Sequence, residues 1–555
     1  MLSTMQDIPL AITRIMQHGT TVHGTSEVVT WTGTGARRAS YAEVGRRVAQ
    51  LAHALRELGI SGDERVATLM WNNQEHLECY LAVPSMGAVL HTLNLRLPAG
   101  RLAWIADQAE DRVVVVDGTL VPLLAAVLPE LKTVEHVVVT GPADTAPLER
   151  AGKRIHRYEE LLAGRPTGFD WPQDLDERSG AALCHTSGTT GDPKGVLYSH
   201  RSTYLHSLQI CTAEGFGLGV TSRVLPVVPM FHVNAWGIPY AAMLSGASLV
   251  MPDRFLQPEH LARMIATERP TNAAAVPTIW TGLLHHLDEH PADLSSLREV
   301  IVGGSACPLP LMKAFQERYG TRILQAWGMT ETSPLGSVAR EPAGVAGDAA
   351  WAYRATQGRL PATVQVRLVG PDGTVVPNDG TTVGEIEIRG PWITGSYYGS
   401  DHRADPSGGG RFHDGWLRTG DLGSVSPDGY LRLTDRAKDV IKSGGEWISS
   451  VELENHLLGH PAVEDAAVIA VPDPTWGERP LALVVLRPDD SATAPGEEHR
   501  LRALRDFLAR HVARWQVPEH WAAVPAIPKT STGKSDKKAL RASHADAAVP
   551  LRTFR

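Results

Sequence analysis

Two kinds of hydrophobic spacing alternate along the first half of the chain. Apolar residues recur at steps of three and four between residues 40 and 59, which predicts an amphipathic helix that ends at Gly59. The valine run at 113–116 is continuous, as expected of a strand buried on both faces of a parallel sheet. Residues 65–70 and 73–87 show the same order of strand and helix. This half is therefore predicted to be a layered α/β fold.

The spacing changes in the second half. The segments 364–369, 384–390 and 430–434 alternate apolar and polar residues, which predicts a small antiparallel β region. Beyond it, about 100 residues, an ordinary domain size, carry helix and strand patterns of their own. We therefore expect an α/β fold with a large N-terminal domain of layered subdomains plus this β region, residues 1–435, and a smaller α+β C-terminal domain, residues 436–555.

Length and composition agree with this division. A chain of 555 residues exceeds the size at which a single core stops growing. The apolar runs are too short to cross a bilayer, so no membrane span is expected. The first ten residues carry Asp7 and no basic region before an apolar stretch, which is unlike a secretory signal. These features predict a cytoplasmic protein.

Charge and cysteine usage exclude two further classes. The net charge is −8 without a long basic run, which argues against nucleic acid as the main partner. The four cysteines are scattered without CxxC spacing, so neither a zinc site nor a disulfide framework is expected.

Residues 184–195 have the composition of a phosphate cradle, with four hydroxyls, three glycines and one lysine. Glycines let backbone N–H groups turn toward an anion, and hydroxyls and the lysine add further donors. The spacing differs from the Walker A loop because Pro193 precedes Lys194. A solvated Gly/Ser/Thr turn is the alternative.

A second candidate stretch follows at 224–240. Pro226 and Pro229 argue against a regular central strand here, because proline has no backbone N–H to donate. We therefore expect the end of a strand followed by an irregular segment that forms a wall. This stretch contains Phe231, His232 and Trp236. Such residues are typical of an apolar pocket that contains one polar group, or of a buried aromatic cluster in a core.

Two further stretches carry groups suited to a nucleotide. In the strand and turn at 322–332, Trp327 could pack on an adenine, Thr330 could donate to phosphate and Glu331 could hold Mg²⁺. A core tryptophan beside a solvated carboxylate is the alternative. Asp421 stands on a glycine turn, where it suits either the two hydroxyls of a ribose or a structural turn. Lys534 ends a Pro- and Gly-bearing loop that could also be plain surface.

Taken together, five stretches are similar to the motifs of the adenylate-forming superfamily, which includes acyl-CoA synthetases, adenylation domains and beetle luciferases. They are TSGTTGDPKG, AWGMTET, GWLRTGD, DRAKDVIKSGGEW and PKTSTGK, and the resemblance covers nearly the whole chain. Two more, PVVPMFHVNAWGIPY and IKSGGEWISSVELEN, look most like medium- or long-chain fatty acyl-CoA synthetases. The resemblance implies a mobile C-terminal domain hinged near Lys438.

The resemblance also implies a reaction in two steps. A carboxylic acid is first joined to the α-phosphate of MgATP, which expels pyrophosphate, and the acyl-adenylate then meets the thiol of coenzyme A, which releases AMP. Lys534 would supply positive charge at the α-phosphate, and Lys442 would serve the second step. Domain rotation would exchange the two lysines.

Further roles are carried over by resemblance. The polyphosphate would be held by Thr186, Ser187, Gly188, Thr189, Thr190 and Lys194, and Mg²⁺ by Glu331 with Thr186. AMP would be bound by Gly304, Gln325, Trp327, Thr330, Asp421 and Arg436. The thioester-forming surface would consist of Lys442, Gly444, Gly445 and Trp447. Trp327 stands where many relatives have tyrosine.

His232, Val233 and Trp236 are assigned to the acid by resemblance, with His232 near the reacting carboxylate and Trp236 as a gate. No acidic residue stands between Phe231 and Tyr240 to pair with an α-ammonium group, so a hydrophobic carboxylic acid fits better than an amino acid. Linear, aryl and polycyclic tails all remain open. A homodimer is suggested by the same resemblance.

Three functions are therefore compared. The first is a complete acyl-CoA ligase. The second is the same fold performing only thioesterification from a supplied acyl-adenylate, because a small misplacement of reacting groups could silence the first step. The third is a nucleotide-binding protein without turnover.

Overall fold

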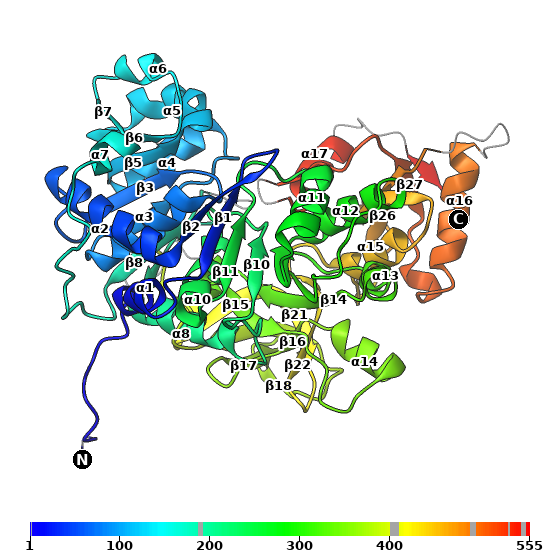
Figure 1. The fold of residues 1–555 in the computed structure, drawn as a ribbon. Coiled ribbons are helices and arrows are strands. Elements are labelled where there is room, and N and C mark those ends of the chain that lie inside the picture. Colours follow the sequence, from blue (N-terminus) through cyan, green and yellow to red (C-terminus); the bar gives the residue numbers. More distant parts are fainter. Residues whose placement is uncertain are drawn as a thin grey trace.

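The structure is a computed structural model, and it describes residues 1, 3–186, 192–399, 410–488, 496–530, 533–545 and 551–554. Three sheets organise it (Figure 1). Two belong to the N-terminal body and the third belongs to the smaller C-terminal unit. The fold class predicted from the sequence is confirmed.

The first sheet has the strand order β7-β6-β5-β3-β4-β8-β9 and is parallel except for its last pair, β8 and β9. Its strands are β3 (Arg65–Leu69), β4 (Val89–Thr92), β5 (Asp111–Asp117), β6 (His136–Thr140), β7 (Arg154–Arg157), β8 (Gly180–His185) and β9 (Gly195–Ser199). Its helices are α2 (Tyr41–Glu57), α3 (Gln74–Ser85), α4 (Ala99–Ala109), α5 (Val121–Val127), α6 (Ala146–Glu149) and α7 (Tyr158–Leu162). Blue and cyan mark these elements in Figure 1.

Helix α2 shows how the spacing predicted this unit. Ser40 caps it, since its hydroxyl accepts from the Glu43 backbone N–H while the Glu43 carboxylate accepts from the Ser40 N–H. Its apolar positions, including Val44, Leu51 and Leu55, are fully buried. The predicted helix and the β5 strand are both confirmed.

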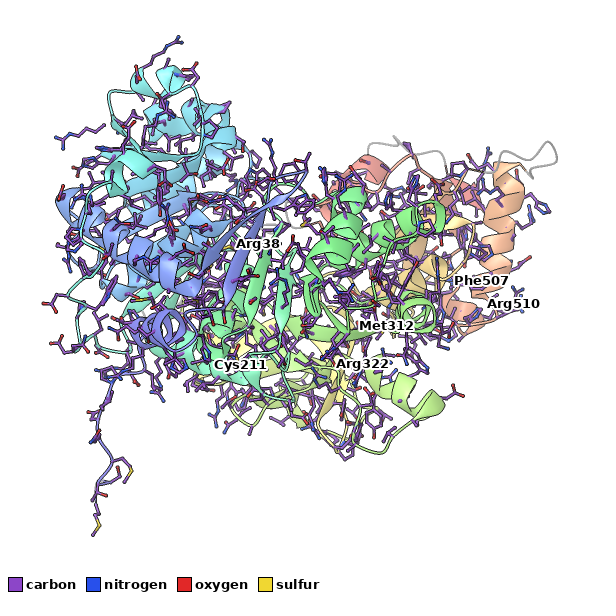
Figure 2. All side chains as sticks on the ribbon, viewed as in Figure 1. Arg38, Cys211, Met312, Arg322, Phe507 and Arg510 are labelled. Carbon is purple, nitrogen blue, oxygen red and sulfur yellow. The ribbon has the colours of Figure 1, made fainter. Side chains whose placement is uncertain are left out.

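The second sheet begins with the order β2-β1-β11-β10-β12-β13-β14 and is parallel from β1 to β14. Its strands are β1 (Glu27–Trp31), β2 (Ala36–Ser40), β10 (Arg223–Pro226), β11 (Ser248–Met251), β12 (Asn272–Ala275), β13 (Glu299–Val302) and β14 (Arg322–Gly328). The helices are α1 (Ile12–Thr21), α8 (His200–Cys211), α10 (Ile238–Ser245), α11 (Pro258–Glu268), α12 (Pro277–Glu289), α13 (Leu309–Tyr319) and α14 (Gly347–Arg354). Met312 of α13 is fully buried among the side chains of this unit (Figure 2).

The antiparallel β region continues the second sheet instead of forming a separate one. β14 pairs antiparallel with β15, and the order then runs β16-β22-β21-β19-β17-β18. These strands are β15 (Leu335–Val338), β16 (Gly358–Arg359), β17 (Gln365–Val369), β18 (Val375–Val376), β19 (Gly384–Arg389), β20 (Phe412–His413), β21 (Trp416–Val425) and β22 (Tyr430–Arg436). The alternation was predicted from sequence, but the pairing of β14 with β15 was not visible there.

The C-terminal unit has its own sheet, β24-β23-β26-β27-β28, with β25 paired to β26. Its elements are β23 (Ile441–Ser443), β24 (Glu446–Ile448), α15 (Ser450–Leu458), β25 (Val463–Asp473), β26 (Gly477–Leu486), α16 (Glu497–Leu508), β27 (His520–Ala523), α17 (Lys537–Ala545) and β28 (Arg552–Thr553). β22 of the body ends at Arg436 and β23 begins at Ile441. The proposed boundary of 435/436 lies at the end of β22 and stays a prediction.

The C-terminal unit touches the body directly. Arg487, just beyond β26, places Nη2 2.8 Å from Nε2 of His285 on α12. Phe507 is on the outer helix α16, and the guanidinium of Arg510, just beyond that helix, lies over its ring (Figure 2). Among the residues described, no helix is long and apolar enough to cross a membrane. The cytoplasmic location stays a prediction.

Candidate active site

One cavity of about 730 Å³ opens where the loops of the two body sheets meet the C-terminal unit. It brings together residues that lie far apart in the sequence. Of the residues predicted for the site, its walls contain Thr186, Lys194, His232, Val233, Trp236, Gly304, Trp327, Thr330, Glu331, Arg436 and Lys534. The sequence motifs therefore converge in space.

The phosphate cradle is the loop of a β-hairpin. Strands β8 and β9 pair antiparallel, and the Thr186 N–H donates to the Lys194 carbonyl over 3.0 Å. The Lys194 N–H donates in turn to Thr186 Oγ1 over 3.0 Å. These bonds close the base of the loop. Four predicted phosphate contacts, Ser187, Gly188, Thr189 and Thr190, lie outside the described residues.

Glu331 occupies the wall next to the hairpin. It is 4% exposed, and its Oε1 accepts a 2.7 Å hydrogen bond from the Tyr397 hydroxyl. The Lys194 ammonium lies 4.6 Å from the centre of the same tyrosine ring. Tyr397 thus contacts both Glu331, which is predicted to bind Mg²⁺, and Lys194, which is predicted to bind phosphate.

Mg²⁺ prefers oxygen ligands and is bound in many enzymes by one or two protein groups together with substrate phosphates. A single carboxylate, Glu331, and the Thr186 hydroxyl fit that mode of binding. Within the described ranges no group of three or more His, Cys, Asp or Glu residues forms a metal cage. The donor set suits an ion that arrives with a nucleotide.

Asp421 is fixed on both of its carboxylate oxygens. The Trp327 indole N–H donates to Oδ2 over 2.9 Å, and the Arg436 Nε lies 3.2 Å from Oδ1. The cross-strand pairing of Asp421 on β21 with Arg436 on β22 explains the second contact. Trp327 is 6% exposed and also lines the cavity. The two alternatives left open by the sequence, a core tryptophan and a tryptophan at the cavity, therefore both apply.

Gln325 and Gly304 have different positions relative to the cavity. The Gln325 amide is used within the protein, since it accepts from the Cys307 N–H and donates to the carbonyls of Arg354 and Thr356. Gln325 does not line the cavity, and its part in AMP binding stays a prediction.

At Gly304, φ is +86°, and an added Cβ would lie 3.4 Å from Cε of Lys534. Because 3.4 Å is an ordinary contact distance, it is the positive φ that favours glycine at this position.

The wall predicted to bind the acid has an unusual backbone. Four consecutive residues, Val233 to Trp236, have positive φ values between 42° and 58°, a left-handed turn that costs about 1–2 kcal/mol per non-glycine residue. Asn234 lies in the short helical turn α9 (Val233–Trp236), and its side chain accepts from the Tyr80 hydroxyl over 3.1 Å and from the Cys184 thiol over 3.3 Å. Such strain persists where surrounding contacts hold it, as these two do.

This turn places Trp236 against the opposite wall. A Cβ added at Gly303 would lie 3.2 Å from Cη2 of the Trp236 ring. Phe216 and Leu335 line the cavity on the same side, and each is less than 5% exposed. The result is an apolar compartment beside His232.

Two basic groups that line the cavity, His232 and Lys534, have lowered pKa values. Burial, with the positive charges of Lys534 and Arg96, lowers the pKa of His232 to about 3. Burial and the Arg436 guanidinium lower the pKa of Lys534 to about 8, against the pull of Asp421 and Glu331. His232 is therefore a neutral hydrogen-bonding group at neutral pH, while Lys534 is mostly charged and close to its titration point.

The predicted thioester-forming residues lie elsewhere. Lys442 is exposed on β23, and Gly444 and Gly445, with φ of 61° and 88°, form the two-residue turn to β24. Trp447 is half-buried beside Lys442 across the hairpin. None of these residues lines the cavity.

The predicted hinge lies between these two sites. Lys438 follows β22, and burial together with Arg436 and Arg541 lowers its pKa despite the adjacent Asp439. The Lys438 carbonyl accepts from Arg541 of α17 over 3.4 Å, and the same guanidinium pairs with Asp439 over 2.6 Å. The hinge segment is thus tied to the C-terminal unit.

Sequence reasoning missed several residues of this site. Tyr397, Phe216, Leu335 and Asn234 stand outside the five motifs or had no assigned role. Asparagine adopts left-handed backbone more readily than valine or tryptophan, so Asn234 carried a weak signal. Tyr397 carried none, because its role depends on its contact with Glu331 across the fold.

Comparison with known proteins decides the family. The AMP-binding enzyme family matches residues 17–398, and the AMP-binding enzyme C-terminal domain matches residues 452–534. The chain belongs to the AMP-binding enzyme family. The resemblance to adenylate-forming acyl-CoA synthetases is confirmed, and the chain is an AMP-forming acid–thiol ligase whose substrates include a carboxylic acid, ATP and coenzyme A.

The similar curated proteins are ligases of related acids. A 3-methylmercaptopropionyl-CoA ligase of Ruegeria pomeroyi is 43% identical over 98% of this chain and 99% of its own length. A long-chain-fatty-acid–CoA ligase of Thermus thermophilus is 43% identical, with 97% and 96% covered. A medium-chain-fatty-acid–CoA ligase of Ectopseudomonas oleovorans is 40% identical, with 98% of both chains covered.

A solved structure has the same arrangement. The anthranilate CoA ligase AuaEII in complex with anthranoyl-AMP superposes with a TM-score of 0.86 at 26% identity, covering 98% of this ligase and all of that chain. Membership in an enzyme family also sets aside the third hypothesis of a nucleotide-binding protein without turnover. The ligase is an enzyme.

Proposed function

We propose that this ligase activates a hydrophobic carboxylic acid as an acyl-adenylate and then transfers the acyl group to coenzyme A. One observation carries the proposal. A single cavity wall combines the Lys534 cation, the neutral His232 and the apolar compartment beside Trp236. The cation suits the α-phosphate, the neutral histidine suits the reacting carboxylate, and the apolar compartment suits the acyl tail.

In the first step a carboxylate oxygen of the acid would attack the α-phosphorus of ATP. The bond to the bridging oxygen of the β-phosphate breaks, and pyrophosphate leaves. The carboxylate is an anion and ATP is a polyanion, so the two repel each other. Positive charge must therefore be in position at the α-phosphate before the reaction, and Lys534 supplies it. Asp421, held by Trp327 and Arg436, would accept from the ribose hydroxyls. Glu331 and Thr186 would hold Mg²⁺, which neutralises phosphate charge when bound.

In the second step the sulfur of coenzyme A would attack the acyl carbonyl carbon, and the bond to AMP breaks. Lys442 and the turn at Gly444 and Gly445 would have to reach the cavity for this step. They are exposed on the C-terminal unit, so a rotation about Lys438 is required. Lys534 lines the cavity in the conformation described here, which supports its use in the first step.

The compartment supports an acid with an uncharged, apolar tail. Phe216, Val233 and Leu335 form its walls, and all three are nearly buried. Burying a charged group there would be unfavourable without a partner. The curated relatives named above act on a thioether-bearing acid and on fatty acids, which are consistent with this tail. A homodimer also stays a prediction.

The test is a substrate screen run in two formats. The purified ligase is given ATP with each of a series of aliphatic, thioether, aryl and terpenoid acids, and pyrophosphate and acyl-CoA are both measured. The same acids are supplied as synthetic acyl-adenylates with coenzyme A. Acyl-CoA in both formats supports the proposal, and acyl-CoA from adenylates alone would indicate the thioesterification-only alternative. Silence in both formats across all acids contradicts the proposal.

A further inference from the structure

A chain of four polar side chains runs through the interior below the phosphate hairpin. His91 Nδ1 lies 2.8 Å from an Asp111 carboxylate oxygen, and His91 Nε2 lies 3.0 Å from His185 Nδ1. His185 Nε2 lies 2.8 Å from the Gln108 amide oxygen. Both Asp111 and His91 are fully buried. None of these residues has a role in the mechanism above.

The chain connects three strands and a helix to the cavity. His91 is on β4, Asp111 on β5 and His185 at the end of β8, one residue before Thr186. Gln108 is on α4, and its side chain lines the cavity beside Asp192, Lys194 and Gly195. The end of the chain therefore faces the part of the cavity assigned to the β- and γ-phosphates.

A glycine makes room for this arrangement. A Cβ at Gly195 would lie 3.1 Å from Nε2 of His185, which is tighter than ordinary contact. A Cβ at Gly399 would lie 3.9 Å from the Gln108 amide nitrogen, which is an ordinary contact distance, so only Gly195 is needed for space. The His185 ring thus lies against a position that has no side chain.

The amide oxygen of Gln108 makes the contact with His185, which requires the Nε2–H tautomer of that histidine. Because the Gln108 oxygen is bound to His185, the amide nitrogen is directed away from the ring. No acceptor for this nitrogen is present in the described parts of the chain. The neighbouring Asp192 carboxylate is paired with Arg101, so its charge is offset. Among the described residues, this chain of side chains therefore ends in amide N–H donors without an acceptor, at the wall of the cavity that Lys194 also lines.

We propose that Gln108 is a phosphate-binding residue, whose amide donates to the β- or γ-phosphate of ATP and is oriented by His185, His91 and Asp111. The inference rests on the proposed function, since that assigns this end of the cavity to the polyphosphate. Hydrogen bonds to charged groups are about twice as strong as neutral ones, and here the donor is held in place before the nucleotide arrives.

The test compares ligands that have and lack the outer phosphates. ATP, inorganic pyrophosphate and AMP are titrated by calorimetry into the wild-type ligase and into Gln108→Leu. We expect ATP and pyrophosphate to bind roughly tenfold more weakly to the variant, the effect of losing one hydrogen bond to a charged group. AMP should bind with unchanged affinity, and thioesterification from a preformed acyl-adenylate should be unaffected.

Two further variants separate binding from folding. Gln108→Glu keeps the size but replaces donors by negative charge, so it should weaken ATP more than leucine does. Gln209→Leu, on α8 away from the cavity, is the control for changing a helical glutamine and should alter no affinity.

Three results would overturn the inference. They are unchanged ATP affinity in Gln108→Leu, tighter ATP binding in that variant, which would mean that the amide oxygen faces the phosphates, and equal losses for ATP and AMP. If the wild-type ligase binds ATP and the variants match it, only this inference fails. If the wild type binds no ATP, the proposed function fails instead.

Discussion

Two lysines of the C-terminal unit, Lys534 and Lys442, have opposite environments. Lys534 lies in the cavity beside His232 and Gly304, and burial with Arg436 lowers its pKa to about 8. Lys442 is exposed on a hairpin, where its backbone N–H donates to the Glu478 carboxylate over 2.8 Å. Both lysines belong to motifs of the same family. Their environments differ because the fold places them at different positions.

The comparison teaches how one unit could serve two reactions. Lys442 is on β23 and Lys534 follows β27, in a unit built on one sheet, so the unit cannot place both side chains in the cavity without moving. In the conformation described, Lys534 lines the cavity and Lys442 does not, which agrees with the role proposed for Lys534 in the first step. Four predictions would break or sharpen this division, and they follow in order of expected effect.

The largest effect is expected from Lys534→Ala. Losing one transition-state donor costs about 10²–10³-fold, so adenylation measured by ATP–pyrophosphate exchange should fall by that factor. Thioesterification from a preformed acyl-adenylate should persist. Lys538→Ala, an exposed lysine on α17, is the matched control and should affect neither step. Equal damage to both steps by Lys534→Ala would contradict the division of roles.

Lys442→Ala should show the reverse pattern. We expect thioesterification from preformed adenylate to fall about 10–100-fold, the effect of losing one charged hydrogen bond, while exchange continues. Single-turnover measurement of each half-reaction checks this. A Lys442→Ala ligase that loses exchange instead would show that the hairpin acts in the first step.

The pH dependence of adenylation should follow the Lys534 ammonium. Its pKa is lowered to about 8, so the cation is present below that pH and is lost as the pH rises through it. The kcat/KM for ATP, which reports groups of the free enzyme, should fall about tenfold per unit well above pH 8. Lys534→Arg keeps the charge and should remove this decline, although its rate is lower. An unchanged decline in that variant would assign the titration to another group.

The smallest effect is expected at the contact between the body and the C-terminal unit. His285→Ala and Arg487→Leu each remove the 2.8 Å contact between α12 and the residue after β26. Exposed contacts are worth about 0.2–1 kcal/mol, so adenylation should slow by up to fivefold. The double variant should be no slower than either single one, because both remove the same interaction. Additive effects would show that the two residues act separately.

Much of the fold was predictable because local patterns specify local structure. The three- and four-residue spacing and the Ser40 cap predicted α2, and the continuous valines predicted the buried strand β5. The alternation in β17, β19 and β22 predicted antiparallel strands. The continuation of these strands into the parallel sheet was not predictable, since the β14–β15 pairing depends on long-range contacts.

The candidate site was predicted unevenly for a similar reason. Motif residues such as Lys194, Glu331 and Lys534 could be named because family resemblance assigns roles to short segments. Tyr397 and Gln108 could not, because each acquires its role from a partner far along the chain, Glu331 and His185 respectively. The left-handed turn at 233–236 was also missed, since two of its residues, Val233 and Trp236, disfavour that backbone.

The sequence by itself therefore determined the family, the order of the domains and the residue types available for both steps. These are properties of composition, spacing and short motifs, which are local. Only the tertiary structure decided which lysine enters the cavity, because that depends on how the C-terminal unit packs on the body. It also decided that Trp327 contacts Asp421 and that His185, itself in contact with the buried His91, contacts Gln108. Such contacts join residues that are distant in the chain, and their geometry exists only after folding.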